Sequence, residues 1–464
     1  MSKQKNAVIG EKSKKVGMDL TEGSILKCLL VFAVPIVVTN VIQQFYSMVD
    51  LMVIGQYVGA TGTVAVSTGG EVSDMVTPVA TAFSTAGQIY IAQLFGAKKT
   101  DKVKKGIGTL ITLMMIMALV IMTCTIIFSS QILRLLNCPS EAFREAMEYM
   151  IITAIGIPFI YGYNAVCGVL RGMGESRKPL IFVLVAATVN IFLDILLVAV
   201  FKMGAAGTAI ATAMSQFGSF IAAFIYMYIN REQFDFELKL SYFKIDRPAA
   251  EVILKQGIPQ AARSMLVRFS MLWVNSSVNS YGLVASATNS VGNKLQKFLE
   301  VFLTGVTQAS GAMVGQNLGA QKAERAKKTV WYCFFSCMII SLVLTVFAWF
   351  WPREIFGIFT KDPDVLDFGV IYMHILIMHF FMSAITGSFQ SMVTGSGFAS
   401  MNFLIGVLDG VVCRIGFSVL FAYVMGMGVV GFFWGTAFSR TIPGLVCFLY
   451  FISGKWKERK LLTE

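Results

Sequence analysis

The chain has 464 residues, of which 56% are hydrophobic and 14% charged, and its mean hydropathy is +0.70. This composition excludes an ordinary soluble enzyme and indicates a helical protein that crosses the membrane many times. The net charge of +12 is expected to report topology and contact with anionic lipid, so we expect no nucleic-acid partner.

The apolar segments predict an all-α polytopic membrane protein with twelve transmembrane helices, because each segment can cross about 30 Å of hydrocarbon. In chain order they span residues 25–56, 62–95, 107–130, 142–171, 178–201, 205–229, 250–281, 284–317, 329–351, 366–394, 400–425 and 429–453. The predicted organisation is a tail (1–24), a first lobe of six helices (25–229), a linker (230–249), a second lobe of six (250–453) and a second tail (454–464). We expect no cleavable signal peptide, because the first tail is polar and basic.

The two lobes repeat one sequence pattern at a spacing of 223 to 224 residues. Gln93 returns as Gln316, and Pro35 returns as Pro259. An even number of crossings in each repeat gives both lobes the same orientation. We therefore predict parallel lobes related by a pseudo-twofold axis along the membrane normal.

Lys and Arg residues are distributed unequally between the two sides of the membrane. Of the 38, 27 lie in the tails and in the loops on the same side as the tails, five lie on the opposite side, and six lie within predicted helices. The positive-inside rule predicts that both termini are cytoplasmic. We expect an integral protein of the plasma membrane.

Carboxylates inside the membrane are the strongest functional signal, because a charge at this depth is costly. Asp194 of the first lobe aligns with Ser418 of the second, and Asp50 aligns with Trp273 or Val274. We therefore expect intramembrane carboxylates of the coupling site in the first lobe only. This pattern is typical of an ion-coupled transporter built from two repeats.

Counting about 1.5 Å per residue from the helix ends places Asp50, Asp194 and Thr212 at one depth. Asn190 lies one helical turn from Asp194 on the same face. The oxygens of these four residues suit a hard cation such as Na⁺. Two close carboxylates could equally share a proton, because they cannot cheaply both ionise. The alternative is that each residue is a separately satisfied polar group facing a crevice.

A second group of charges is reversed in sign between the repeats. Glu71 and Asp74 of the second predicted helix align with Lys294 and Lys297 of the eighth. All four lie near mid-membrane, where contact with lipid is too costly. We predict an electrostatic clasp or charged lining between the lobes. The alternative is local neutralisation, for which Glu300 offers Lys297 a partner on its own helix.

Five further polar residues are candidates for the substrate cavity: Gln43, Tyr46, Asn164, Arg263 and His374. The 26 Met and 38 Phe residues would suit varied amphipathic cations, although lipid-facing packing explains most of them. The eight cysteines have neither disulfide nor metal-ligand spacing. We predict no metal site, no cofactor other than a coupling ion, and a monomer that contacts small-molecule substrates and lipid.

Several segments resemble the multidrug and toxic compound extrusion (MATE) family. They are PIVVTNVIQQFYSMVDLMVIG at 35–55, IAQLFGA at 91–97, LRGMGESRKP at 170–179, NIFLDILL at 190–197 and VGQNLGA at 314–320. The likeness covers nearly the whole chain, and the motifs occur in the family's order. It implies an inner-membrane antiporter of two six-helix lobes that open alternately, expelling organic cations or other toxic compounds in exchange for Na⁺ or H⁺.

The resemblance also implies a location for the coupling site. In members with a first-lobe cation site, the residues that line it fall on Asp50, Asn190, Asp194 and Thr212 of this chain. Some members also carry acidic residues in the seventh and tenth helices, where this chain has arginines and histidines instead. The resemblance therefore implies coupling in the first lobe alone.

Other functions are compatible with parts of the sequence. A flippase for lipid-linked oligosaccharide or peptidoglycan precursors would need a cationic cavity, which Lys294, Lys297, Arg263 and Arg268 could supply. An intramembrane enzyme is not expected, because no cluster of residues has ligand spacing or a nucleophile motif. A passive channel would not need acidic residues in one repeat only.

Overall fold

The structure is a computed structural model, and it describes residues 17–231 and 243–463. Most of the predicted first tail and of the predicted linker lies outside the described residues. Within them the chain is helical, with connections that are mostly short.

Twelve long helical segments and no strand are present in the described residues, which confirms the predicted all-α fold. The first lobe contains α1 (Ile25–Tyr57), α2 (Gly59–Gly96), α3 (Thr100–Ile127), α5 (Phe143–Gly172), α6 continued by η1 (Arg177–Asp194, Ile195–Val200) and α7 (Gly204–Ile229). The second lobe contains α9 (Arg247–Asn279), α10 (Leu283–Gly319), α11 (Ala323–Phe350), α13 (Pro363–Gly395), the continuous segment α14–η3–α15–η4 (Ala399–Val407, Leu408–Cys413, Arg414–Val419, Leu420–Val424) and α16 with α17 (Val429–Phe438, Thr441–Ser453). Three short helices, α4 (Ser129–Leu135), α12 (Pro352–Gly357) and η5 (Lys455–Lys457), complete the described part.

Nine of the twelve segments are long and apolar enough to be recognised as membrane spans by composition alone. The other three are α2, α9 and α10, which carry most of the charged residues at mid-membrane depth. These three helices lie at the junction of the lobes, where neighbouring helices separate their polar sides from lipid.

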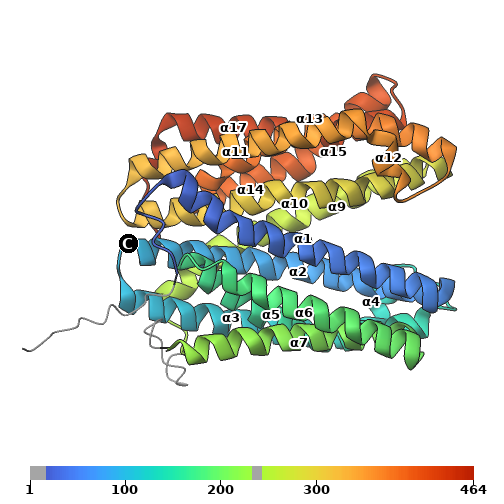
Figure 1. The fold of residues 1–464 in the computed structure, drawn as a ribbon, viewed down its shortest axis with the longest axis horizontal. Coiled ribbons are helices and arrows are strands. Elements are labelled where there is room, and N and C mark those ends of the chain that lie inside the picture. The colour runs from blue at the N-terminus through green and yellow to red at the C-terminus, as the bar shows by residue number, and fades with distance from the viewer. Residues whose placement is uncertain (1–16, 232–242, 464) are drawn as a thin grey trace, which may run out of the picture.

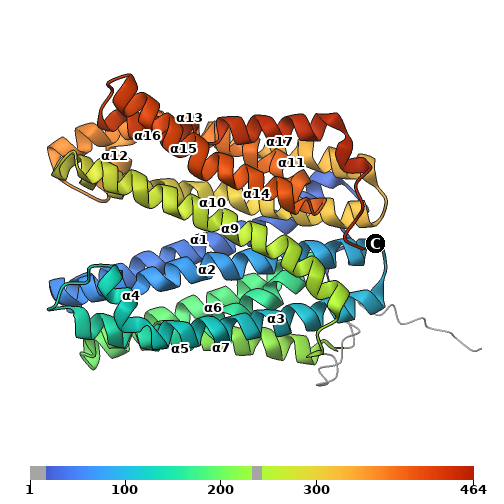
Figure 2. The ribbon, with the colours of Figure 1, turned by 180° about the vertical axis from the view of Figure 1, so that it is seen from behind.

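The contacts between helices follow the repeat. Within the lobes, α2 lies against α5, and its counterpart α10 lies against α13. Between the lobes, α1 lies against α10, while α9, the counterpart of α1, lies against α2. Exchanging the lobes exchanges these contacts, as a pseudo-twofold axis requires. Figures 1 and 2 show the lobes side by side with their helices running in nearly the same direction.

The turns after the helices obey the same symmetry. Gly174 and Gly397 adopt left-handed φ angles of 84° and 73°, and Lys98 and Gln321 adopt φ angles of 56° and 59°. Each pair is separated by 223 residues in the sequence. A non-glycine residue in this region is uncommon, so its recurrence shows that the duplicated loops keep one backbone conformation.

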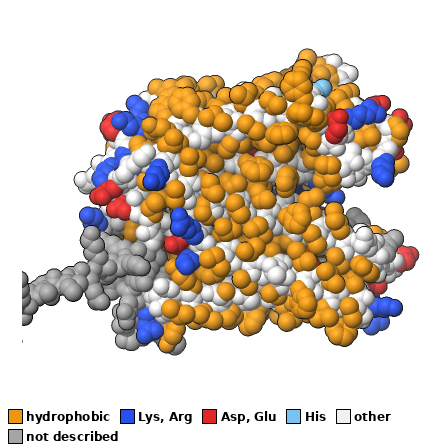
Figure 3. Space-filling view, in the orientation of Figure 1, with side chains coloured by type: hydrophobic (Ala, Val, Ile, Leu, Met, Phe, Trp, Pro, Cys, Tyr) orange, Lys and Arg blue, Asp and Glu red, His pale blue; other side chains and the backbone are white. Residues whose placement is uncertain are grey.

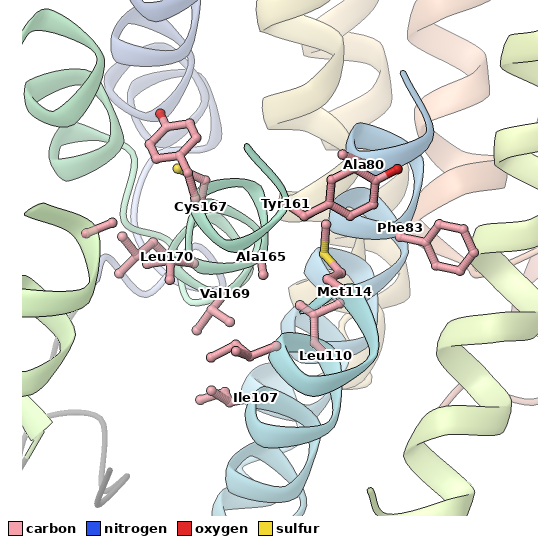
Figure 4. Packing of buried hydrophobic residues seen from close by; sticks show 14 of the residues in the cluster. Ala80, Phe83, Ile107, Leu110, Met114, Tyr161, Ala165, Cys167, Val169 and Leu170 are labelled. Carbon is pink, nitrogen blue, oxygen red and sulfur yellow. The ribbon is translucent and has the colours of Figure 1, made fainter. Parts of the chain in front are cut away.

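The core of the first lobe lies where α2, α3 and α5 meet. Figure 4 shows Leu110 and Met114 of α3 close to Tyr161 of α5 and Ala80 of α2. The Tyr161 hydroxyl donates a hydrogen bond of 3.2 Å to a backbone carbonyl of α2. Because lipid supplies little hydrophobic driving force between helices, close packing and such hydrogen bonds hold this lobe together.

At one end of the molecule, the last turns of α2 and α10 touch each other across the pseudo-twofold axis. A Cβ atom on Gly96 would lie 2.0 Å from the Gln316 carbonyl oxygen, and one on Gly319 would lie 2.0 Å from the Gln93 carbonyl oxygen. Only glycine permits this approach of two backbones. We call this contact the closed end.

The two glutamines of the closed end also bind the opposite lobe through their side chains. Gln93 Nε2 donates to the Gly395 carbonyl at 2.8 Å, and Gln316 Nε2 donates to the Gly172 carbonyl at 2.9 Å. Both glutamines are fully buried. Loss of either donor would leave a buried carbonyl without its partner, which is costly.

Residues 18–23, which we call the N-terminal strap, cross from the first lobe to the second. The Leu20 N–H donates to Gln316 Oε1 at 3.2 Å, and Lys322 Nζ donates to the Thr21 carbonyl at 3.0 Å. The strap begins on its own lobe, where its first residue donates a backbone hydrogen bond of 3.1 Å to the turn after α5.

Residues 459–463, which we call the C-terminal strap, make the reciprocal crossing. The Leu462 N–H donates to Gln93 Oε1 at 2.8 Å, and Lys102 Nζ donates to the Thr463 carbonyl at 2.9 Å. This strap also covers the turn after α13 of its own lobe. Each strap therefore ties the two lobes together at the closed end.

The lobes separate toward the other end, where α4 and α12 lie (Figures 1 and 2). Figure 3 shows the surface hollowed between the lobes at that end. A cavity of about 260 Å³ lies there between α2 of the first lobe and α9, α10 and α15 of the second. We call this space the crevice.

Candidate functional site

The structure brings Asp50 and Asp194 together. Asp50 lies in α1, and Asp194 is the last residue of α6, immediately before the π-helical segment η1. The two carboxyl groups lie within hydrogen-bonding reach of each other. Asp194 and Asn190 are fully buried, whereas Asp50 is partly exposed.

The polar atoms of this pair have too few partners within the protein. Both carboxylate oxygens of Asp194, one oxygen of Asp50 and both amide atoms of Asn190 are buried without a hydrogen-bond partner. Two facing carboxylates are both acceptors, so neither can satisfy the other unless a proton or cation lies between them. Oxygen atoms without donors are what a Na⁺ ion or a shared proton requires.

Thr212, the fourth predicted member, forms no hydrogen bond to Asp194 in the described part of the chain. It is partly exposed on α7, and its carbonyl accepts a hydrogen bond of 2.8 Å from the Ser215 hydroxyl. The hydroxyl of Thr208, one turn earlier, is buried without a partner. Thr208, which the sequence analysis did not name, is therefore a further candidate on the same helix.

Three of the other predicted cavity residues lie in the first lobe. Tyr46 lies one turn before Asp50 in α1, and its hydroxyl lies near Gln216 of α7. Gln43 is partly exposed on α1, and among the described residues no hydrogen bond joins it to Asp50 or Asp194. Asn164 donates 2.8 Å to the Ile160 carbonyl of its own helix, which is the satisfied packing arrangement expected of an amide within a bundle.

The predicted clasp crosses the lobe interface through a different basic residue. Arg268 of α9 lies 2.9 Å from Asp74 and 3.3 Å from Glu71, both on α2. Among the described residues, no ion pair joins either acid to Lys294 or Lys297, so the predicted partners were wrong. α9 is the helix of the second lobe that lies directly against α2, and Arg268 reaches across this contact.

Lys294 and Lys297 are exposed on α10, and Lys297 lines the crevice. The alternative partner for Lys297, Glu300, is engaged elsewhere: it pairs with Arg440, and His379 Nε2 lies 3.8 Å from its other oxygen. Lys297 therefore contributes positive charge to the crevice, whereas Lys294 is exposed outside its lining, and within the described residues neither forms a direct link between the lobes.

The second lobe contains a charged network that the sequence analysis missed. Asp409 pairs with Arg414 at 2.9 Å and lies 3.8 Å from Arg440. Arg414 and Asp409 are almost completely buried. With Glu300, two carboxylates lie inside the second lobe, and Asp409 is the one that the sequence analysis did not name. In this network, unlike the Asp50–Asp194 pair, each carboxylate has a basic partner.

The histidine in this network is His379, not the predicted His374. His379 is buried, and its Nε2 lies 3.0 Å from Gln296 Nε2. The His374 ring packs against Trp349 of α11, with ring centroids 4.9 Å apart, and Trp349 is exposed on the outside of the bundle. The structure therefore places His374 away from the space between the lobes.

Arg263 lies in a second cavity, as predicted for a residue of the substrate cavity. This cavity, of about 240 Å³, lies between α2 and the second-lobe helices α9, α10, α13 and α17. Arg263 Nη2 donates to Gln390 Oε1 at 3.2 Å, and its stem occupies space left by Gly406. We call this space the central cavity.

Two parallel repeats that meet at one end and enclose polar cavities define a membrane transporter with two lobes. The MatE family model matches residues 35–196 and again residues 259–424, and the chain therefore belongs to the multidrug and toxic compound extrusion family. The double match also corresponds to the two repeats.

Relatives in bacteria share most of the chain. The probable multidrug resistance protein YpnP of Bacillus subtilis (strain 168) is 28% identical over 451 residues, which cover 96% of this chain and 99% of that protein. The multidrug export protein MepA of Staphylococcus saprophyticus is 23% identical over 429 residues, covering 92% and 94%.

Solved structures show the same fold. A MATE crystal structure in complex with MaL6 has a TM-score of 0.90 at 19% identity and covers 96% of this chain and all of its own. The outward-facing conformation of a multidrug resistance MATE family transporter also has a TM-score of 0.90 at 19% identity, covering 96% and 99%.

Proposed function

We propose that this protein is a secondary antiporter of the plasma membrane that exports organic compounds in exchange for Na⁺ or H⁺. The Asp50–Asp194 pair carries the proposal, because its buried oxygens lack donors from the protein. An ion that enters from outside would neutralise the pair, and its release inside would restore the charge. The names of the relatives as multidrug resistance and export proteins support the export function.

The two ends of the molecule support an alternating-access mechanism. The closed end lies on the side that carries most of the Lys and Arg residues, which we propose is cytoplasmic, together with both termini. The crevice then faces outward. In the proposed cycle, ion binding at Asp50 and Asp194 shifts the equilibrium between this conformation and one in which the closed end has opened. A single chain supplies both lobes, so we propose a monomer.

The test is transport by the purified protein in liposomes with Na⁺ and pH gradients imposed separately. We expect efflux of ethidium, an organic cation carried by many exporters, to follow one gradient and to stop when that gradient is collapsed. The Asp50→Asn variant should bind ethidium but lose dependence on the gradient. Transport that ignores both gradients would contradict coupling, and transfer of a labelled lipid-linked saccharide without ethidium efflux would indicate a flippase.

A further inference from the structure

The charges inside the two lobes are opposite in sign. The intramembrane charges of the first lobe are the carboxylates Asp50, Glu71, Asp74 and Asp194. The second lobe carries two carboxylates, Glu300 and Asp409, against six basic residues, Arg263, Arg268, Lys294, Lys297, Arg414 and Arg440. An excess of arginine beside a cavity favours an anionic group of a ligand.

Arg263 is the arginine whose charge the network does not neutralise. Asp409 is held by Arg414 and Arg440, and Glu300 is held by Arg440. Among the residues that the structure describes, no carboxylate lies within salt-bridge distance of Arg263. Its one hydrogen bond goes to Gln390, although a guanidinium has five N–H donors.

The central cavity around Arg263 is lined mainly by hydroxyl and amide side chains. They include Thr85, Gln260, Gln308, Gln390 and Ser391, and the lining also contains Glu300 and Arg440, which pair with each other. The Gln308 side-chain oxygen is buried without a partner, so it can accept a hydrogen bond from a ligand. The lining therefore offers hydrogen-bonding groups to a polar part of a substrate.

We propose that the central cavity binds organic substrates through an oxyanion, a carboxylate or phosphate group, held by the Arg263 guanidinium. The proposal rests on the export function proposed above and adds a substrate class to the organic cations that the sequence resemblance implies. Arginine is suited to this role because its planar fork can donate two parallel hydrogen bonds to one oxyanion. Gly406 permits the side chain to occupy this position, because any Cβ there would overlap the arginine stem.

The experiment compares two probes that differ in one charge: dansylglycine, which carries a carboxylate, and its carboxamide. Binding to the full-length protein in lipid nanodiscs is followed by dansyl fluorescence. A charge-assisted hydrogen bond predicts that the wild-type protein binds the carboxylate about 10- to 100-fold more tightly than the carboxamide. Arg263→Gln should abolish this preference and leave carboxamide binding unchanged, whereas Arg263→Lys should retain part of it.

Lys297→Gln is the matched control, because Lys297 is a basic residue of the same lobe that lines the crevice and not the central cavity. It should keep the preference. An equal loss in Lys297→Gln and Arg263→Gln would overturn the proposed site in favour of a general positive potential, and so would a wild-type protein without preference. Ethidium efflux on a gradient combined with no preference would overturn this inference alone and leave the antiporter proposal intact.

Discussion

At the residue scale, the protein contains two kinds of buried carboxylate that should respond differently to mutation. Asp50 and Asp194 face each other without donors, whereas Asp409 is held by arginines. An unpaired carboxylate is costly to the fold unless an external ion neutralises it, so its presence indicates function. A paired one is part of the structure, and removal of its partner is what destabilises the protein.

We predict that Asp50→Asn and Asp194→Asn each abolish gradient-driven efflux without loss of membrane insertion or of thermal stability. Asparagine keeps the volume of the side chain and removes the charge that the ion would bind. Transport in liposomes and the melting temperature are the two measurements. Asp364→Asn, which changes an exposed acid at the start of α13, should leave both measurements unchanged. Wild-type efflux in both site variants would remove the pair from the mechanism.

We predict that two salt bridges of the same length contribute very differently to the free energy of unfolding. The Arg414–Asp409 pair at 2.9 Å is almost fully buried, with side chains 1% and 3% exposed, whereas in the Arg268–Asp74 pair at 2.9 Å they are 23% and 61% exposed. Arg414→Leu should cost about 3–5 kcal/mol, because it leaves a buried carboxylate short of a partner. Arg268→Leu should cost about 1 kcal/mol or less. Comparable losses of melting temperature would contradict this assignment of burial.

At the element scale, the sequence predicted the helices and the symmetry well. Length and hydropathy locate spans, and duplicated motifs fix their pairing, because both depend on patterns that extend over many residues. Depth counting also brought Asp50 and Asp194 together correctly. Depth counting wrongly paired Glu71 with Lys294, because two residues at the same depth can lie on helix faces that do not point toward each other.

The charged network around Asp409 was missed because the helix that contains this residue is irregular. This helix is interrupted by the π-helical segments η3 and η4, and Asp409 lies inside η3. Each extra residue in a helix turns the following side chains by about 100°, so a period of 3.6 residues misplaces them. The equivalent helix of the first lobe has η1 at the position matching η4, immediately after Asp194. The second interruption, η3, is peculiar to the second lobe within the described residues.

Substitution of Gly96 tests the contact between α2 and α10. We predict that Gly96→Ala loosens the closed end, because its Cβ would lie 2.0 Å from the Gln316 carbonyl oxygen and such overpacking costs about 1–3 kcal/mol. Gly218→Ala in α7 is the matched control, because nothing lies within 4 Å of its Cβ. Labelling of a single cysteine introduced at Lys98, in a background without the native cysteines, should become faster in Gly96→Ala only. Equal labelling in both variants would show that the contact does not control this end.

At the scale of the whole molecule, the two straps and the two glutamines hold the lobes together through reciprocal hydrogen bonds at the closed end. We predict that Gln93→Ala and Gln316→Ala shift the protein toward an open cytoplasmic end to a similar extent, because each removes one side-chain donor to the opposite lobe and the acceptor for one strap. Spin labels at positions 98 and 321 should report longer distances in both variants.

Deletion of residues 459–464 provides the comparison, because it removes the C-terminal strap and keeps both glutamines. The spin-label distance should increase less than in Gln93→Ala, since the Gln93 bond to Gly395 remains. If the deletion leaves the distance at the wild-type value while Gln93→Ala increases it, the glutamines lock the lobes and the straps only cover them.

The crossed straps also bear on how the protein is made. The contact of residues 459–463 with the first lobe cannot form until both lobes have been synthesised, and the N-terminal strap must wait for α10 before it can dock. Either lobe can acquire its own core before then, as the first-lobe cluster of α2, α3 and α5 illustrates. During biosynthesis the nascent chain therefore passes through a stage in which the two lobes are inserted and the C-terminal strap has not yet docked. At this stage the two lobes are held together at the closed end by the glutamines and by the N-terminal strap.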